Sequence, residues 1–308
     1  MSKENFKTSI GGQAIIEGIV MKGPEKTCIA VRQPDGEIHI ETTKTRKNPF
    51  RKIPILRGAV AMIISLIEGY KNITKAAEYA YPEGEDEDKF DEFLKDKFGD
   101  KAGTTMGIVS AVLGSLLSIA LFIVLPTIVT GGLAKLFVMS NGLKSLCEGV
   151  LKIVIFIAYL FFVTRIKDIH RVFEYHGAEH KSIACYEHGE ELTVENVKRF
   201  SRFHPRCSTS FLFIVIIISI IVFSFVPVWD NVLLRVGLKL LALPLIMGIA
   251  FEILKFSGSH DNFFCKALAF PGLLVQRLTA FEPDDGQMEV AIASLKQVLP
   301  DKAEQAKW

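Results

Sequence analysis

Four long apolar segments dominate the pattern of hydrophobic and polar positions, and each is long enough to cross a lipid bilayer as a helix. They are Gly107–Thr130, Cys147–Val163, Ser210–Val228 and Asn231–Leu254. A helix of about 17–25 predominantly apolar residues spans the hydrocarbon core of a membrane. A short loop joins the first segment to the second, and another joins the third to the fourth. The pattern therefore predicts a mainly α-helical, multi-pass membrane protein with about four transmembrane helices in two hairpins.

The N-terminal part has a different pattern, which is typical of a small α+β part outside the membrane. Hydrophobic and polar residues alternate in 28–33 and again in 37–42, and the turn sequence Pro-Asp-Gly lies between them. Alternation on both sides of such a turn predicts a β-hairpin.

Three other segments favour helices or linkers. Residues 53–67 are apolar but interrupted by charges, which is typical of a membrane-surface or re-entrant helix or of a core helix in the soluble part. The acidic run 83–100 predicts a solvated linker or a short polar helix. Residues 263–280 are apolar and could lie against the membrane. An amphipathic helix follows, with Asp284 or Asp285 as its N-terminal cap.

These patterns divide the chain into six parts. They are a cytosolic N-terminal segment with a β-hairpin (1–54), a membrane-surface helix with an acidic linker (55–106), a first transmembrane hairpin (107–165), a cytosolic loop (166–209), a second transmembrane hairpin (210–256) and a cytosolic C-terminal segment with an amphipathic helix (257–308).

The distribution of basic residues predicts the orientation in the membrane. Eight of them lie between the second and third apolar segments: Arg165, Lys167, Arg171, Lys181, Lys198, Arg199, Arg202 and Arg206. The two short hairpin loops carry fewer. Because cytoplasmic loops are enriched in Lys and Arg, both termini and the 164–209 loop are expected in the cytosol of a cell-membrane protein.

Composition narrows the function classes. Lys and Arg total 36 against 34 for Asp and Glu, which gives no basic footprint for nucleic acid. The five cysteines form no CxxC pair, which fits a reducing compartment. The apolar segments are almost free of ionisable residues at mid-depth, and this disfavours a transporter. Membrane lipids are the expected partners.

The cytosolic loop carries the main candidate for chemistry, the sequence His176-Gly177-Ala178-Glu179-His180. Residues four apart share one face of a helix, so both imidazoles could bind one metal ion. This is the H-x-x-E-H order of inverzincins, in which a carboxylate beside a zinc-bound water acts as general base. The alternative is a pair of surface histidines, with Glu179 as an ordinary ion-pair partner.

A catalytic zinc usually has three protein ligands and one open position. Cys207 is the first candidate for the third ligand and His204 the second, followed by Glu190 or Glu17. Arg206 lies next to Cys207 and favours its thiolate form. The alternative is that Cys207 is a small buried hydrophobe and His204 a packing residue.

The glycine-rich stretch 10–24 carries two further candidates, Gln13 and Glu17. The stretch is either a loop that brings Gln13 or Glu17 into the metal site or a tight turn followed by a packed strand.

Three segments resemble signature sequences of the YqhQ-like bacterial membrane proteins. They are IGGQAIIEGIVMKGP, YHGAEHKSIACYEHGEELTVENVKRFSRFHPRCSTSF and FEPDDGQMEVAIASL. The resemblance implies a multi-pass bacterial membrane protein that is a metal-dependent enzyme. It does not imply a particular substrate. By position, the resemblance points to Gln13, Glu17, His176, Glu179, His180, His204, Arg206 and Cys207.

We therefore expect a membrane-anchored hydrolase that depends on a divalent metal of the zinc type, with its site at the cytosolic membrane surface. Glu179 would activate a metal-bound water, and Arg206 or Lys181 would stabilise a developing oxyanion. The substrate would be a peptide or a lipid-linked molecule. The alternative is a non-catalytic scaffold or regulatory protein whose structural metal has four protein ligands.

Overall fold

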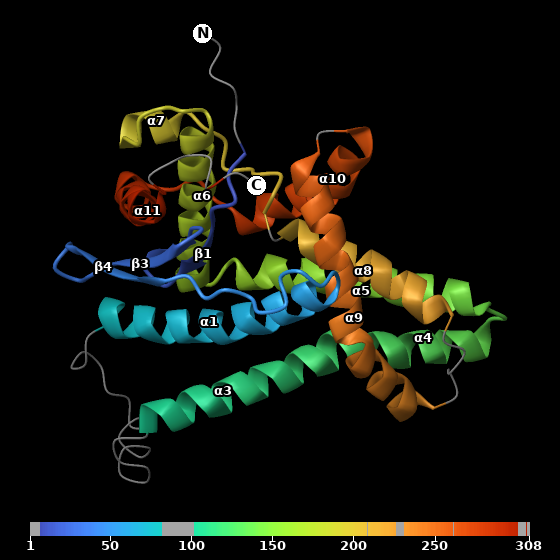
Figure 1. Ribbon diagram of the computed structural model, residues 1–308. Coiled ribbons are helices and arrows are strands. Elements are labelled where there is room, and N and C mark those ends of the chain that lie inside the picture. Colours follow the sequence, from blue (N-terminus) through green and yellow to red (C-terminus); the bar gives the residue numbers. More distant parts are fainter. Residues whose placement is uncertain are drawn as a thin grey trace. The chain divides into compact units, whose positions relative to one another are not determined.

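The computed structural model describes residues 7–81, 102–207, 209–225, 231–260, 262–300 and 306. Within these ranges the chain is mainly helical and carries one four-stranded antiparallel sheet (Figure 1). The acidic run 83–100 lies outside the described residues. The chain forms two compact units, which we describe separately: one comprises 1–80, 158–215 and 244–308, and the other comprises 81–157 and 216–243.

The sheet of the first unit has the strand order β1-β2-β3-β4. The strands are β1 (Gly11–Ile15), β2 (Gly18–Lys22), β3 (Lys26–Arg32) and β4 (Ile38–Lys44). The β3–β4 pair confirms the predicted hairpin. The β1–β2 pair is a second hairpin with Ile15 opposite Gly18, so the glycine-rich stretch forms paired strands and not a loop.

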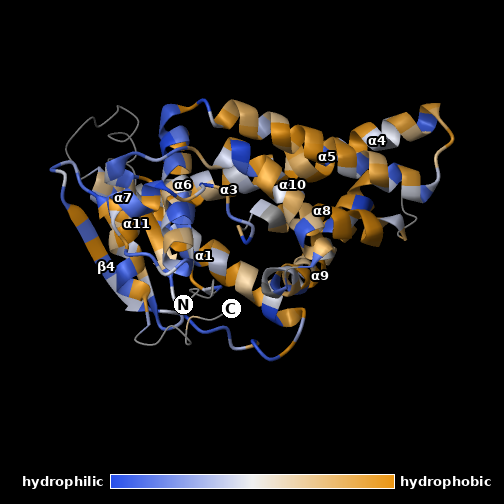
Figure 2. Cartoon of the chain, turned by 90° about the horizontal axis from the view of Figure 1, so that it is seen from above, coloured by the Kyte–Doolittle hydropathy of each residue, from blue (hydrophilic) through white to orange (hydrophobic). Residues whose placement is uncertain are grey.

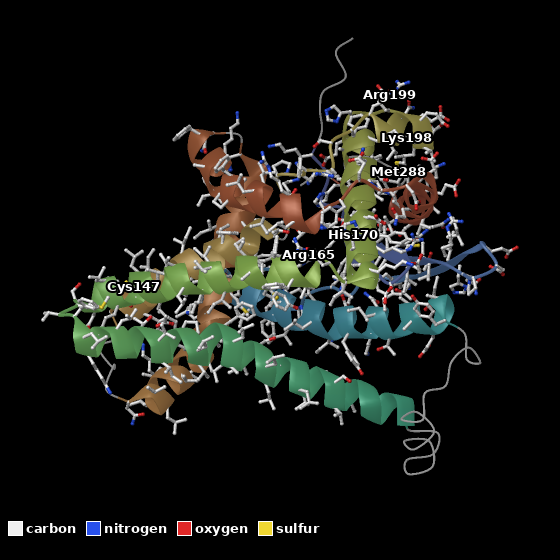
Figure 3. All side chains as sticks on the ribbon, turned by 180° about the vertical axis from the view of Figure 1, so that it is seen from behind. Cys147, Arg165, His170, Lys198, Arg199 and Met288 are labelled. Carbon is white, nitrogen blue, oxygen red and sulfur yellow. The ribbon has the colours of Figure 1, made fainter. Side chains whose placement is uncertain are left out.

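Helices cover both faces of the sheet, and this explains why the middle strands are apolar at successive positions. Side chains alternate between the two faces of a strand. In β2, Ile19 and Met21 belong to one buried cluster and Val20 to another. The first cluster includes residues of α6 (Lys167–Glu187) and α11 (Asp285–Val298), while the second includes α1 (Leu56–Ala80). Figure 3 shows Met288 of α11 close to α6.

Helix α1 is longer than the apolar pattern indicated. It begins at Leu56 and continues to Ala80, and its C-terminal residues Ala76 and Ala80 are buried against the sheet. The helix therefore packs against the sheet at its C-terminal end, and its placement at a membrane surface stays a prediction. Its outer face still exposes large apolar side chains, with Leu66 64% exposed.

Side-chain N-caps are present at Thr193 and Asp284, and the cap at Asp284 was predicted. The side chain of Thr193 accepts a hydrogen bond from the Asn196 amide at the start of α7 (Val194–Lys198). Asp284 and Gln287 form a reciprocal capping box at the start of α11. Such caps satisfy amide groups that have no partner within the helix and stabilise it by about 1 kcal/mol.

Among the residues that the structure describes, three helices are long and apolar enough to cross a membrane, which suggests a membrane protein. They cover Gly107–Leu136, Asn141–Val163 and Val232–Gly258. The first combines α3 (Ala102–Ile119), a π-helical turn (Ala120–Val124) and α4 (Leu125–Leu136). The other two are α5 (Asn141–Val163) and α9 (Val232–Ser259). Figure 2 shows α4 and α5 hydrophobic along most of their length, whereas α7 is largely hydrophilic.

The remaining apolar segment forms α8 (Thr209–Ser224), a helix of 16 residues. It is shorter than the three candidate spans, so the count of four spans and the cytosolic orientation of the termini stay predictions.

The second unit contains a cluster of ionisable side chains. Glu148 of α5 pairs with Lys239 of α9 and, at 3.0 Å, with Lys152. Arg235 approaches the same carboxylate at 3.6 Å. Glu148, Arg235 and Lys239 are each at most 2% exposed. Tertiary structure thus gathers charges that are scattered in the sequence near the ends of two apolar segments.

Candidate metal centre

The two histidines of the H-x-x-E-H motif lie on one face of α6. The ring centroids of His176 and His180 are 4.3 Å apart. Both residues are in the middle of a continuous helix, so the predicted i, i+4 geometry is present.

Each histidine is oriented by a backbone carbonyl through its Nδ1 atom. Nδ1 of His176 lies 2.5 Å from the oxygen of Thr279, and Nδ1 of His180 lies 2.6 Å from the oxygen of Arg202. A carbonyl oxygen can only accept, so Nδ1 carries the proton in both rings. In the neutral imidazole, Nε2 is then the atom with a lone pair available for a metal.

Cys207 completes a group of three possible ligands. Its Sγ lies 3.3 Å from Nε2 of His176. One ligand atom each from His176, His180 and Cys207 lies within 4.8 Å of the others. Two imidazoles and a thiolate are a donor set that zinc and related ions accept in tetrahedral sites.

The cysteine is held in a form suited to binding a cation. Burial raises the pKa of the Cys207 thiol, but its interactions with His176 and His180 outweigh this effect and hold the pKa well below its usual value. Conversely, burial lowers the pKa of His176, while the contact with Cys207 overcomes it and raises the pKa to about 9. The two pKa shifts both favour a Cys207 thiolate beside a protonated His176.

His204 lies close to this group but belongs to a different network. Its Nε2 lies 3.6 Å from Oε2 of Glu187, and Arg206 pairs with the other oxygen of that carboxylate. The backbone amide of Thr8 also donates to Glu187, at 2.7 Å. His204 is therefore near His180, with 5.6 Å between ring centroids, but is not one of the three converging groups.

The side chain of Gln276 fixes the backbone that carries this loop. Its Oε1 accepts from the His204 amide at 2.8 Å, and its Nε2 donates to the His204 carbonyl at 2.9 Å. Gln276 belongs to α10 (Phe263–Thr279) and is fully buried. The pair of bonds holds the loop so that Cys207, three residues further on, faces α6.

Glu179 lies beside the histidines and is anchored by β1. Its Oε1 accepts a hydrogen bond of 2.8 Å from the Gly12 amide. A side chain at Gly12 would lie 2.9 Å from Cδ of Glu179, so glycine is required for this close approach. Glu179 as a whole is 6% exposed, and it borders the same cavity as the two histidines.

That cavity has a volume of about 550 Å³. Its walls come from β1, β2, α1, α6 and the loop that ends at Cys207. Gln13 and Arg206 line it together with the three possible ligands and Glu179. A small ligand entering this cavity would therefore meet the histidine–cysteine group and the carboxylate together.

Two of the sequence candidates are placed elsewhere. Glu17 occupies the β1–β2 turn and binds Arg171, with NH2 to Oε2 at 2.8 Å, and also accepts from the Tyr175 hydroxyl. It ties the hairpin to α6 and does not line the cavity. Glu190 follows α6, near Cys185, and does not line the cavity either. Lys181, the other expected oxyanion partner, pairs with Glu282.

Gly177 allows α6 to pack closely against the segment that follows α10. A side chain at this position would overlap the carbonyl oxygen of Phe281. The segment after α10 therefore runs directly along α6, and this contact brings the Thr279 carbonyl to His176.

Sequence reasoning missed the residues that orient the site. Glu187 is seven residues after His180, two helical turns away on the same face, so its helical spacing was a usable signal. Gln276 and Thr279 come from a distant helix, and nothing in the local pattern links them to the histidines.

Comparison with known proteins agrees with the resemblance. A family profile described as "Protein of unknown function (DUF1385)" matches residues 53–301. The uncharacterized protein YqhQ of Bacillus subtilis (strain 168) is 36% identical over 308 residues, which cover 97% of this chain and 95% of that protein. No solved structure matches the chain. The profile and the full-length similarity together show that the chain belongs to the DUF1385 family of YqhQ-like proteins.

Proposed function

We propose that this protein is a membrane-anchored, metal-dependent hydrolase. The observation that carries the proposal is the convergence of His176, His180 and Cys207 in the wall of a large cavity, with Nδ1 of each histidine held by a backbone carbonyl. This is how histidine ligands are oriented in metal sites.

The donor set fits a divalent ion of the zinc type. Nitrogen and thiolate donors select such ions over magnesium or calcium, which prefer oxygen. When bound, the ion would supply a Lewis acid and lower the pKa of a water molecule to about 7. In this proposal His176, His180 and Cys207 would hold the ion through Nε2 of each ring and the cysteine sulfur.

Glu179 is the proposed general base. It borders the same cavity as the ligands, and the Gly12 amide holds one of its oxygens. The other oxygen is then available to take a proton from an attacking water. Arg206 lines the cavity with its side chain held by Glu187, and in this proposal its guanidinium stabilises a developing oxyanion.

The substrate is proposed to be a peptide or a lipid-linked molecule at the inner membrane surface. Chain distance supports this placement. The candidate span α5 ends at Val163, 13 residues before His176, and the apolar helix α8 begins at Thr209, two residues after Cys207. Both sides of the site are therefore tied to apolar helices.

The alternative is a scaffold or regulatory protein with a structural metal. It needs four protein ligands, and His204 is the nearest additional donor. The contact of His204 with Glu187 favours three ligands and an open position.

Cobalt substitution tests the proposal. Full-length protein in neutral detergent is loaded with Co²⁺, and its visible absorption is recorded before and after addition of azide. A thiolate-to-cobalt band that Cys207→Ser removes and Cys147→Ser retains is expected, because only Cys207 is in the cluster. Azide should shift the cobalt bands of the wild type, since an open position accepts it. Cobalt bands that do not change on addition of azide would contradict the hydrolase proposal and favour a structural metal site.

A further inference from the structure

The large cavity beside the histidines has a second wall, which the proposed metal chemistry does not use. This polar wall consists of Gln13 of β1 together with Ser65, Glu68 and Asn72 of α1. The three residues of α1 are three and four positions apart, so they lie on one face of the helix. All four belong to the first unit, as the histidine–cysteine group does. One cavity therefore contains both the candidate metal ligands and a polar wall.

Three side chains of the polar wall are uncommitted. Within the described part of the chain, no hydrogen bond engages the side chain of Gln13, Ser65 or Asn72. The Gln13 amide packs against α1, because a Cβ atom at Gly69 would lie 3.2 Å from its Nε2. The amides of Gln13 and Asn72 each offer donors as well as an acceptor. They are therefore positioned in the cavity without being satisfied by the protein.

The charged side chains at this wall neutralise each other. Lys22 of β2 lines the cavity and pairs with Glu68 of α1 at 2.9 Å. Both members of this pair are already engaged, so neither provides a free charge for a ligand. The groups that remain available at the wall are neutral, and this favours a neutral, hydrogen-bonding ligand over a phosphorylated headgroup.

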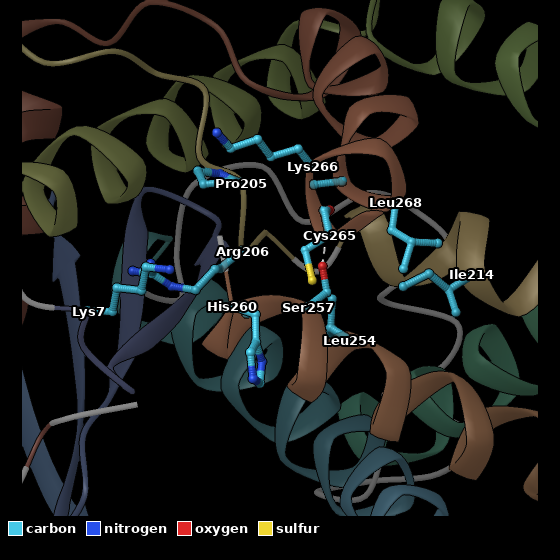
Figure 4. A pocket seen from close by; sticks show the side chains of 12 residues that line it. Lys7, Pro205, Arg206, Ile214, Leu254, Ser257, His260, Cys265, Lys266 and Leu268 are labelled. Atoms are coloured by element: carbon cyan, nitrogen blue, oxygen red, sulfur yellow. Dashed lines mark hydrogen bonds between the residues drawn. The ribbon is translucent and has the colours of Figure 1, made fainter. Parts of the chain in front are cut away.

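Arg206 also borders a smaller cavity, of about 70 Å³ (Figure 4). Two polar groups of that lining are already engaged. The Ser257 hydroxyl donates to the Cys265 carbonyl at 3.2 Å, and Arg206 pairs with Glu187. The larger cavity, of about 550 Å³, has the space for a short peptide and several uncommitted groups to bind it.

A carboxamide in this protein already shows how such a group binds a peptide unit. Gln276 accepts from the backbone amide of His204 and donates to its carbonyl, at 2.8 and 2.9 Å. Strand β1, which carries Gln13, is an edge strand of the sheet. A Cβ atom at Gly11 would have no atom within 4 Å, so the backbone of β1 borders open space there. An edge strand beside open space can accommodate an extended peptide along it.

We propose that the polar wall binds a peptide substrate. The Gln13 carboxamide pairs with the N–H and C=O of one peptide unit, and Asn72 bonds to the substrate further along its chain. This names the substrate class of the proposed hydrolase and rests on that proposal. Gln13 is then a specificity residue, because a substrate without a peptide N–H leaves its acceptor oxygen unpaired.

A binding experiment on the full-length protein in neutral detergent tests this assignment. The probes are N-acetyl-trialanine methylamide and the matched analogue in which esters replace its inner amides, and ligand-observed NMR titration measures their affinities. The wild type should bind the peptide about tenfold more tightly than the ester, because the ester lacks the N–H that Gln13 accepts. Gln13→Leu should weaken peptide binding about tenfold and remove the preference for the amide.

Gln297→Leu is the matched control, since it makes the same chemical change at an exposed position outside the cavity. It should retain both the affinity and the preference. His180→Ala should also retain them, which separates failure of the metal chemistry from failure of the polar wall.

Three results would overturn the assignment. They are the absence of saturable peptide binding, equal affinity of the wild type for peptide and ester, and an unchanged preference in Gln13→Leu. Competition by N-acetylglucosamine, which carries its amide on a sugar, would contradict a peptide as the occupant.

Discussion

At the scale of single residues, the site depends on the backbone carbonyls that orient the two histidines as much as on the histidines themselves. The Thr279 and Arg202 carbonyls fix the Nδ1 protons, and so direct Nε2 of both rings toward Cys207. Without these bonds each imidazole would rotate and exchange tautomers freely. The two rings are therefore held in the tautomer that the proposed metal site requires.

Replacing Glu179 with glutamine tests the general base. Glutamine retains an oxygen that can accept from the Gly12 amide but cannot take up a proton, so metal content should stay unchanged. Turnover should fall by a factor of about 10²–10⁴. Product release from a bacterial lipid extract and from casein, followed by mass spectrometry, measures it. Glu174→Gln, on the same helix but outside the cavity, is the control and should retain activity. Full activity in Glu179→Gln would remove this residue from the mechanism.

Glu187 gives the protein a pH-dependent stability. Burial raises the pKa of this carboxyl, but His204, Arg206 and the Thr8 amide outweigh that effect and lower it. A pKa below the unfolded value of about 4.3 contributes stability that is present above that pH and lost as pH falls through the folded value. The unfolding temperature of the detergent-solubilised protein should therefore fall as the pH drops below about 4.3.

Glu187→Gln should remove part of this dependence. At pH 7 we expect a loss of about 1–3 kcal/mol, because the buried Arg206 guanidinium loses its charged partner. The unfolding temperature should then vary less with acidification than in the wild type. An unchanged pH profile in the variant would assign the acid sensitivity to other carboxyl groups.

At the scale of elements, periodicity and turn chemistry predicted what is local. The i, i+4 histidines, the β3–β4 hairpin and the Asp284 cap were all visible in the sequence. The β1–β2 hairpin was left open as one of two alternatives, because its glycines lower strand propensity and its turn lacks the usual Asn or Gly. Glu17 adopts a positive φ of 47° there, and its bonds to Arg171 compensate for an unfavourable conformation. The choice between Cys207 and His204 depends on Gln276, a contact from a distant helix.

Gly177→Ala tests the contact between α6 and the segment after α10. The added methyl group would overlap the Phe281 carbonyl, so the segment must move and the Thr279 anchor of His176 moves with it. We expect a loss of about 1–3 kcal/mol of stability together with weaker metal retention. Thermal unfolding and metal analysis measure the two effects. Gly114→Ala has open space around it and should be neutral or slightly stabilising. Equal behaviour of the two variants would contradict the close packing.

At the scale of the whole molecule, the chain combines a sheet-containing unit that carries the candidate site with a unit of apolar helices. Among the described helices, α5, α8 and α9 each contribute residues to both units. The apolar unit has its own polar element, the cluster around Glu148. Glu148 and Lys239 are each seven residues after the first residue of their helix, which places them about 10 Å from its end.

Glu148→Gln tests the role of this cluster in the apolar unit. The substitution leaves Lys239, Lys152 and Arg235 without their shared carboxylate in a buried position. Removing one partner of a buried ion pair costs about 3–5 kcal/mol. Thermal unfolding in detergent should show this loss. Lys152→Gln removes a partner that is 15% exposed and should cost less. A neutral Glu148→Gln variant would show that the cluster does not stabilise the unit.

Elemental analysis of the detergent-purified, full-length protein tests the central claim most directly. After purification without chelators, we expect about one zinc-type ion per chain in the wild type and almost none in His180→Ala, which lacks one of the three ligands. His188→Ala, an exposed histidine just after the same helix, should retain the ion. Wild-type protein without a stoichiometric transition metal, or equal metal content in wild type and His180→Ala, would contradict the account.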